Sequence, residues 1–157
     1  MINNDKAVNE LLSWKFRMYL LFKMPAAIFM RIRVHQLNAD VAEVVVPFSW
    51  RTQNPFKSIY FAAQTAAAEL STGVLMLLHL NANKNASLLV TAMEGKFYKK
   101  ANQKITFRCE NGQQIREAIA IALKDKKPFS MKAETKGYLP NGEIASSFIF
   151  EWSVLVK

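Results

Sequence analysis

The sequence contains a single cysteine, Cys109, so no disulfide can form within the chain. Such a chain suits a reducing compartment, and we expect a cytoplasmic protein. Glycine and proline are also scarce, with five residues of each among 157, while hydrophobic residues make up 51%. This composition excludes a disordered chain and is typical of one globular domain with a real core.

Signals for several kinds of site are missing. The first ten residues hold no apolar signal core, and no run of about 18 residues is apolar and free of charge, so we expect no membrane span. Residues 11–30 come closest, but three cations interrupt them. His35 and His79 are the only histidines and have no metal-ligand spacing, so we expect no metal site. Neither a glycine-rich phosphate loop nor a nucleophile elbow is present.

Acidic residues are few beside the basic ones: 12 Asp and Glu stand against 21 Lys and Arg, which gives a formal charge of +9. This surplus favours anionic partners such as a phosphorylated small molecule, nucleic acid or an anionic membrane surface. The cations are spread along the chain without an aromatic RNA-binding signature, so we expect no nucleic-acid partner. The aromatic residues of a predicted helix at residues 6–24 stand among cations. Such a helix could lie on a membrane, although it more often covers the open end of a sheet.

Two further segments have the pattern of helices. Residues 58–80 follow a turn signal, and Ser58 is placed to cap the helix. This segment is apolar almost all round, which predicts burial on nearly every side. Gly73 weakens it by about 1 kcal/mol relative to Ala, which close packing against a sheet could offset. Residues 112–125 are amphipathic and predict a surface helix.

The remaining segments predict strands and one sheet. Asn141-Gly142 marks a tight hairpin. The order of elements predicts an α+β fold in which an antiparallel sheet of about six strands surrounds a long central helix. One such sheet exposes its edges and leaves part of the helix uncovered, so we expect a homodimer or homotetramer. The predicted strands are residues 28–37, 41–48, 86–99, 104–110, 129–139 and 144–155.

Two motifs carry a resemblance to a known family. The first is NPFKSIYFAAQ at residues 54–64, followed on the same helix by Glu69; the second is GKFYKKA at residues 95–101. With the order of elements, they resemble the hotdog-fold thioesterases of the phenylacetic-acid-degradation type, and most closely the domain-of-unknown-function 4442 family. The resemblance covers about residues 25–156. It implies one hotdog domain over residues 1–157, with the helix at 6–24 preceding a core at 26–156.

The resemblance also implies acyl-CoA thioester hydrolysis at a dimer interface. Asn54 and Glu69 would then be the catalytic residues, with Glu69 coming from the facing subunit. The backbone N–H groups of Phe61 and Ala62 would stabilise the oxyanion. Coenzyme A would enter as part of the substrate, and no other cofactor is expected. The implied ligand-binding residues are Ser58, Tyr60, Lys99 and Lys100.

These residue types suit the chemistry. The free N–H groups of a helix N-terminus can stabilise an oxyanion, and a half-buried carboxylate with a raised pKa can activate water. Each residue also has a structural interpretation. Glu69 could be a buried acid satisfied by a hydroxyl or an arginine, Asn54 an ordinary turn residue and Ser58 a helix cap. Lys99 and Lys100 could bind coenzyme A phosphates or form a solvated strand end.

The motifs depart from the family pattern in three places. Residues 60–62 read Tyr-Phe-Ala in place of His-Gly-Gly, Glu69 falls about one position after the usual Asp, and Lys100 replaces a Pro. The first departure supports an alternative function, in which the protein binds an acyl-CoA or fatty-acyl ligand without cleaving it.

Overall fold

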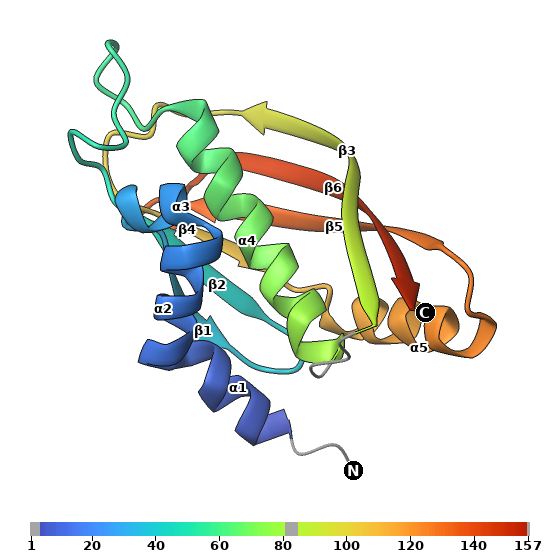
Figure 1. The fold of residues 1–157 in the computed structure, drawn as a ribbon. Coiled ribbons are helices and arrows are strands. Elements are labelled where there is room, and N and C mark those ends of the chain that lie inside the picture. The colour runs from blue at the N-terminus through green and yellow to red at the C-terminus, as the bar shows by residue number, and fades with distance from the viewer. Residues whose placement is uncertain (1–3, 81–84, 157) are drawn as a thin grey trace.

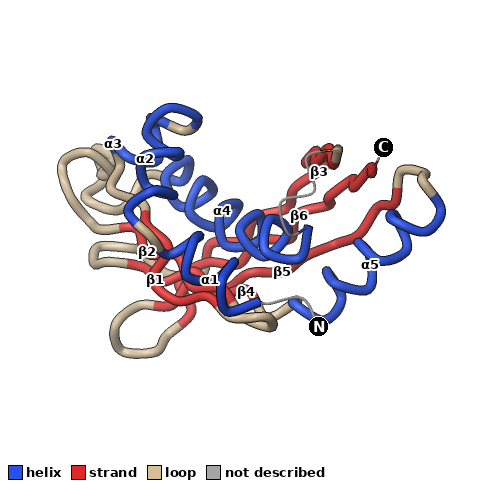
Figure 2. Tube along the Cα trace, turned by 60° about the horizontal axis from the view of Figure 1, so that its bottom comes forward, coloured by secondary structure: helices blue, strands red, loops and turns tan. Residues whose placement is uncertain are grey.

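The computed structural model of the chain describes residues 4–80 and 85–156 (Figure 1). An antiparallel sheet curves around one long helix, and three shorter helices lie along one flank of the molecule (Figures 1 and 2). This confirms the α+β architecture that the sequence predicts. The elements follow in the order α1 (Asn4–Leu12), α2 (Trp14–Lys23), α3 (Pro25–Phe29), β1 (Arg33–Leu37), β2 (Ala42–Val46), α4 (Phe61–Leu80), β3 (Ala86–Phe97), β4 (Ile105–Cys109), α5 (Gly112–Asp125), β5 (Phe129–Tyr138) and β6 (Ile144–Val156).

The sheet has six strands in the order β1-β2-β4-β5-β6-β3, and every neighbouring pair is antiparallel. The short strand β1 forms one edge, and the 12-residue strand β3 forms the other. No side chain of β3 is fully buried. A register shift between Val90 and Ala92 reverses the alternation of β3, so that Met93, Gly95 and Phe97 pair with inward-facing residues of β6. Part of the inner face of β3 is therefore apolar and half exposed.

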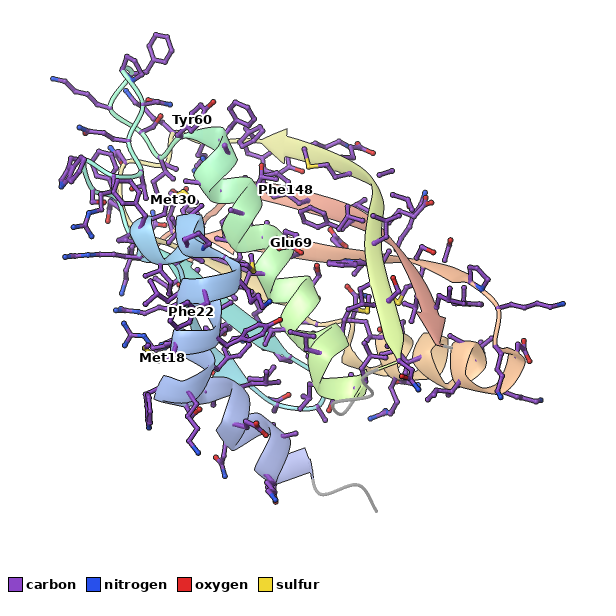
Figure 3. All side chains as sticks on the ribbon, viewed as in Figure 1. Met18, Phe22, Met30, Tyr60, Glu69 and Phe148 are labelled. Carbon is purple, nitrogen blue, oxygen red and sulfur yellow. The ribbon has the colours of Figure 1, made fainter. Side chains whose placement is uncertain are left out.

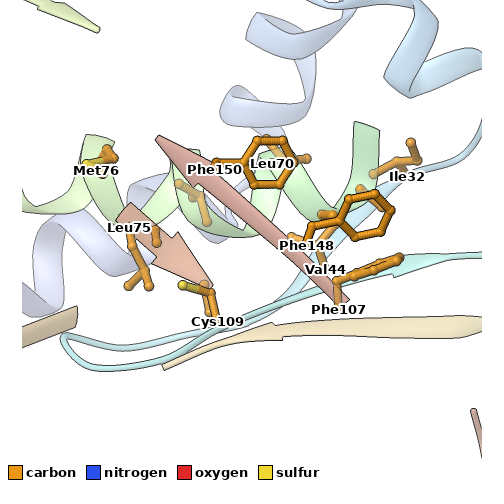
Figure 4. Packing of buried hydrophobic residues seen from close by; sticks show 14 of the residues in the cluster. Ile32, Val44, Leu70, Leu75, Met76, Phe107, Cys109, Phe148 and Phe150 are labelled. Atoms are coloured by element: carbon orange, nitrogen blue, oxygen red, sulfur yellow. The ribbon is translucent and has the colours of Figure 1, made fainter. Parts of the chain in front are cut away.

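The helix α4 forms the centre of the core, as its all-round apolar composition predicts. Most of its residues between Ala63 and Leu80 are buried. By length and composition α4 is also the one described helix that could cross a membrane, but 67% of its most apolar window is buried inside the fold, as in core helices. The rings of Phe107, Phe148 and Phe150 pack in series on the sheet below it (Figure 4).

Three side-chain hydrogen bonds join α4 to strands of the sheet, and a fourth joins Gln64 to the segment before the helix. The Ser146 hydroxyl donates to Gln64 Oε1 over 2.9 Å, and the Gln64 amide donates to the carbonyl of Ile59 over 3.0 Å. The Ser71 hydroxyl donates to Thr135 Oγ1 over 2.8 Å, and the indole of Trp152 donates to Thr72 Oγ1 over 3.0 Å. Because buried polar groups cost free energy unless they are paired, these contacts define one rotation of α4.

The prediction of one continuous helix at residues 6–24 is wrong. The structure divides it at Ser13, whose hydroxyl donates to the Glu10 carbonyl and accepts from the Phe16 N–H, so that Ser13 caps α2. The predicted strand at 28–37 begins too early, because Pro25 starts the short helix α3. Arg31 has a φ of 57°, and the chain turns there before β1 begins.

The start of the central helix also differs from the prediction. α4 begins at Phe61, so Ser58 does not cap it. The Ile59 N–H donates to Ala101 O over 2.7 Å, and the Tyr60 N–H donates to Thr52 O over 2.7 Å. These bonds hold the residues before Phe61 in an extended conformation and delay the helix by one turn.

Candidate functional site

The two sequence motifs meet in space at the start of α4. The hydrogen bond from Ile59 to Ala101 joins the segment that leads into α4 to the residues that follow β3. Nearby, the carbonyl of Ala145 accepts the N–H groups of Tyr98 and Lys99, and Ser146 bonds to Gln64 on α4. Residues 54–64 and 95–101 therefore lie side by side, next to the start of β6.

Asn54 organises the loop that precedes α4. Its Oδ1 accepts the N–H of Phe56 over 3.0 Å, and the N–H and hydroxyl of Ser58 over 3.2 and 3.1 Å. The backbone N–H of Asn54 donates to the Ser58 carbonyl over 2.8 Å, which closes the loop. The side-chain oxygen of Asn54 is thus occupied within its own turn. The Asn54 amide nitrogen has no hydrogen-bond acceptor among the described residues and remains available to a ligand.

The first two N–H groups of α4 are free. The Tyr60 carbonyl accepts the N–H groups of Ala63 and Gln64, and within residues 4–80 and 85–156 no acceptor meets the N–H of Phe61 or Ala62. Such unpaired groups, together with the helix dipole, favour negative charge. The half-exposed rings of Tyr60 and Phe61 stand beside these amides in an edge-to-face contact at 4.8 Å.

Glu69 lies on the flank of α4 that faces β6 and β3 (Figure 3). Its Oε1 is directed along the helix, since a methyl placed on Gly73 would lie 3.4 Å from this atom and 3.6 Å from the ring of Trp152. Burial raises the pKa of Glu69 above its ordinary value. Within the described part of the chain, no hydrogen-bond donor and no cation contacts the Glu69 carboxylate. The alternative in which a hydroxyl or an arginine satisfies Glu69 therefore finds no support there. A carboxylate in this environment is a better base than a solvated one.

The edge strand β3 carries half-exposed apolar side chains on its inner face, which form an apolar wall on the side of the sheet where α4 packs. Met93 and Phe97 of β3 lie on the inner face of the sheet and are 50% and 49% exposed. The ring of Phe97 meets Phe148 edge to face at 5.5 Å. An alkyl or acyl chain placed against these side chains would bury apolar surface. Sequence reasoning missed both residues, because their orientation depends on the register shift in β3.

The two lysines of the second motif differ in their contacts. Lys99 forms an ion pair with Glu143, and this contact, followed by the hydrogen bond from Asn141, lowers the pKa of Glu143. Lys100 is exposed and has no acidic partner among the residues described. Of the two, Lys100 is the cation free to pair with an anionic ligand.

Within one copy of the chain, Glu69 and the free N–H groups at the start of α4 are too far apart to act on the same carbonyl group. Glu69 lies seven residues after Ala62, which is about 10.5 Å along the helix axis. Donors and a base acting through one water on the same carbonyl lie within roughly 7 Å of each other. The Glu69 side chain points toward Gly73 and so does not shorten this distance. No group of three or more potential metal ligands occurs within residues 4–80 and 85–156.

Comparison with known proteins agrees with this architecture. The family model described as "Domain of unknown function (DUF4442)" matches residues 13–139. A protein of unknown function from Chlorobaculum tepidum TLS superimposes with a TM-score of 0.77 at 13% identity, over 91% of this chain and 93% of that one. A Pseudomonas aeruginosa protein titled "Probable Thioesterase" gives 0.76 at 16% identity over 99% and 97%. A thioesterase from Haemophilus influenzae gives 0.65 at 14% identity over 88% of each chain. The fold shared with these proteins is the hotdog fold, and no curated protein matches the chain.

Proposed function

The chain belongs to the DUF4442 family, and on that basis we propose that it hydrolyses acyl-CoA thioesters at a site completed by a second copy of itself. The observation that supports this proposal most strongly is Glu69, a half-buried carboxylate with a raised pKa and no partner in the described chain. Two structural neighbours, one described as a probable thioesterase and one as a thioesterase, are consistent with this chemistry.

In the proposed mechanism, the free N–H groups of Phe61 and Ala62 stabilise the negative charge that develops on the thioester oxygen. Glu69 of the second copy removes a proton from the attacking water, and the coenzyme A thiolate leaves. The acyl chain lies against Met93 and Phe97. Lys100 pairs with a phosphate of coenzyme A, and the Asn54 amide donates to the water or the carbonyl.

The second copy would pair along β3. This edge is long, pairs with no further strand among residues 4–80 and 85–156 and carries exposed apolar residues, and such edges are usually covered. Antiparallel pairing of two β3 strands would extend the sheet and bring the Glu69 side of each α4 toward the other copy. Light scattering at micromolar concentration tests this pairing, and a stable monomer would contradict it.

The activity is tested with a panel of acyl-CoA substrates of increasing chain length, by following release of the coenzyme A thiol. We expect Glu69→Gln to lower kcat by about 100-fold or more. Glu134→Gln, an exposed carboxylate on β5, is the matched control and should retain the wild-type rate. Because burial raises the pKa of Glu69 above 4.5, kcat/KM should fall on acidification with a midpoint above that value. Equal rates for the wild type and Glu69→Gln would reject the assigned base.

A non-catalytic acyl-ligand-binding protein is the second candidate. One observation favours it: Asn54 Oδ1 is already committed to three hydrogen bonds in its own loop, which limits the role of Asn54 in orienting water. Submicromolar acyl-CoA binding by calorimetry, with no thiol release at any chain length, would select this function over hydrolysis.

A further inference from the structure

The outward side of α2 is apolar, although it lies on the surface. Phe16 and Leu20 point into the core and are 8% and 3% exposed. On a helical projection with 100° per residue, Met18 lies on the side of α2 opposite to Phe16 and Leu20. A surface helix normally presents polar residues on this side. The outward residues are instead Trp14, Met18, Leu21 and Phe22, which are 70%, 42%, 42% and 76% exposed.

Cations border this apolar side and no acid interrupts them. On the same helical projection, Lys15 and Arg17 fall on its two margins, and Lys23 ends the helix. No Asp or Glu occurs between Glu10 and Asp40. The surface of α2 therefore combines an apolar strip with positive charge on both sides.

The same composition continues beyond α2. Phe29 of α3 and Trp50 of the loop after β2 are 54% and 70% exposed and meet edge to face at 5.9 Å. The Arg51 guanidinium lies 5.6 Å from the ring of Phe29 and 5.5 Å from that of Trp50. α3 follows α2 on the flank of the molecule away from β3, where Figure 3 also places Met18 and Phe22.

We propose that this basic aromatic surface, formed by the outward residues of α2 with Lys15 and Arg17, binds the surface of an anionic phospholipid bilayer. Tryptophan and phenylalanine insert at the boundary between headgroups and acyl chains, and flanking cations pair with lipid phosphates. Because Phe16 and Leu20 hold α2 in the core, the helix would lie parallel to the bilayer.

The charge distribution argues against a second copy of the chain on this surface. A two-fold contact through α2 would bring like surfaces together and oppose the cations of one copy to those of the other. An anionic bilayer complements all of them at once. This inference does not depend on the catalytic proposal, because no residue of the basic aromatic surface belongs to the candidate site.

The test is co-sedimentation of the full chain with vesicles of pure phosphatidylcholine and with vesicles containing about 30% phosphatidylglycerol. We expect binding only to the anionic vesicles, weakened by salt. The double variant W14S/F22S should bind at least tenfold more weakly. Lys15→Gln should weaken binding about fivefold. Ile121→Ser, on the exposed side of α5, is the matched control and should bind like the wild type.

Three outcomes would overturn the inference: no sedimentation of folded wild-type protein with anionic vesicles, equal binding by W14S/F22S, or equal binding to both kinds of vesicle. Thermal melts confirm that each variant is folded. Size-exclusion chromatography of W14S/F22S supplies a further check, since dissociation of an oligomer by this variant would assign the surface to self-association.

Discussion

The substitution Gly73→Ala tests how closely α4 packs against the sheet. Gly73 lies in the interior of α4 and is buried. The sequence suggests that a glycine here permits a close approach of the sheet. In the structure a methyl at this position would meet Glu69 Oε1 at 3.4 Å and the ring of Trp152 at 3.6 and 3.7 Å, which are ordinary van der Waals contacts.

The expected effect follows from these distances. Replacing glycine by alanine in a helix interior contributes about 1 kcal/mol of stability, and no clash offsets it here. We therefore expect Gly73→Ala to raise the free energy of unfolding by about 0.5–1 kcal/mol. For a domain of this size that is a rise in Tm of roughly 2–4 °C, measured by circular dichroism.

Gly112→Ala is the contrasting variant. A methyl on Gly112 would lie 2.2 Å from the carbonyl oxygen of Ala39 and 2.3 Å from Cα of Asp40, both backbone atoms that cannot move aside cheaply. We expect a loss of about 2 kcal/mol or more. A lower Tm for Gly73→Ala, comparable with that of Gly112→Ala, would show that the sheet lies nearer to α4 than the contacts above indicate.

The remaining predictions concern Cys109, His79 and Gly95. Burial raises the pKa of the Cys109 thiol to about 11, so the native protein should react with a thiol reagent about 100-fold more slowly at neutral pH than the unfolded chain; equal rates would contradict its burial. Burial lowers the pKa of His79 below 6.5, so the unfolded chain takes up this proton at higher pH than the native state does. Stability in urea titrations should therefore fall as pH drops below about 6.5, and less so in His79→Gln; an equal fall in this variant would contradict the burial of the ring. Gly95→Ala should lose about 1–3 kcal/mol, because its methyl would lie 2.7 Å from the ring of the buried Phe148; an unchanged Tm would show that this ring can shift.

Much of the fold could be predicted because its main signals are local and mutually consistent. The all-round apolar pattern of α4 identified the central helix, and the strand patterns located five of the six strands to within two residues at each end, whereas β1 begins at Arg33 and not at residue 28. The errors arose where one side chain or one backbone bond decides the boundary. The Ser13 cap divides the first helix, and the backbone bonds of Ile59 and Tyr60 delay α4, neither of which hydrophobic periodicity can detect.

The candidate site was less predictable. The residues of the two motifs were named from a resemblance, and spacing alone did not indicate that they meet through Ile59 and Ala101. The half-exposed wall of Met93 and Phe97 depends on a register shift that sequence alternation does not reveal. The polar pairs that fix α4 also join residues far apart in the chain, so single-residue propensity carries no signal for them.

The most direct test of the proposed function is a crystal structure with a non-hydrolysable thioether analogue of an acyl-CoA. We expect the group replacing the thioester to lie about 3 Å from the N–H groups of Phe61 and Ala62, with Glu69 of a second copy within reach of it through one water. The acyl chain would contact Met93 and Phe97. An analogue bound away from the start of α4, or a Glu69 carboxylate that faces no bound ligand in either copy, would contradict the proposed function.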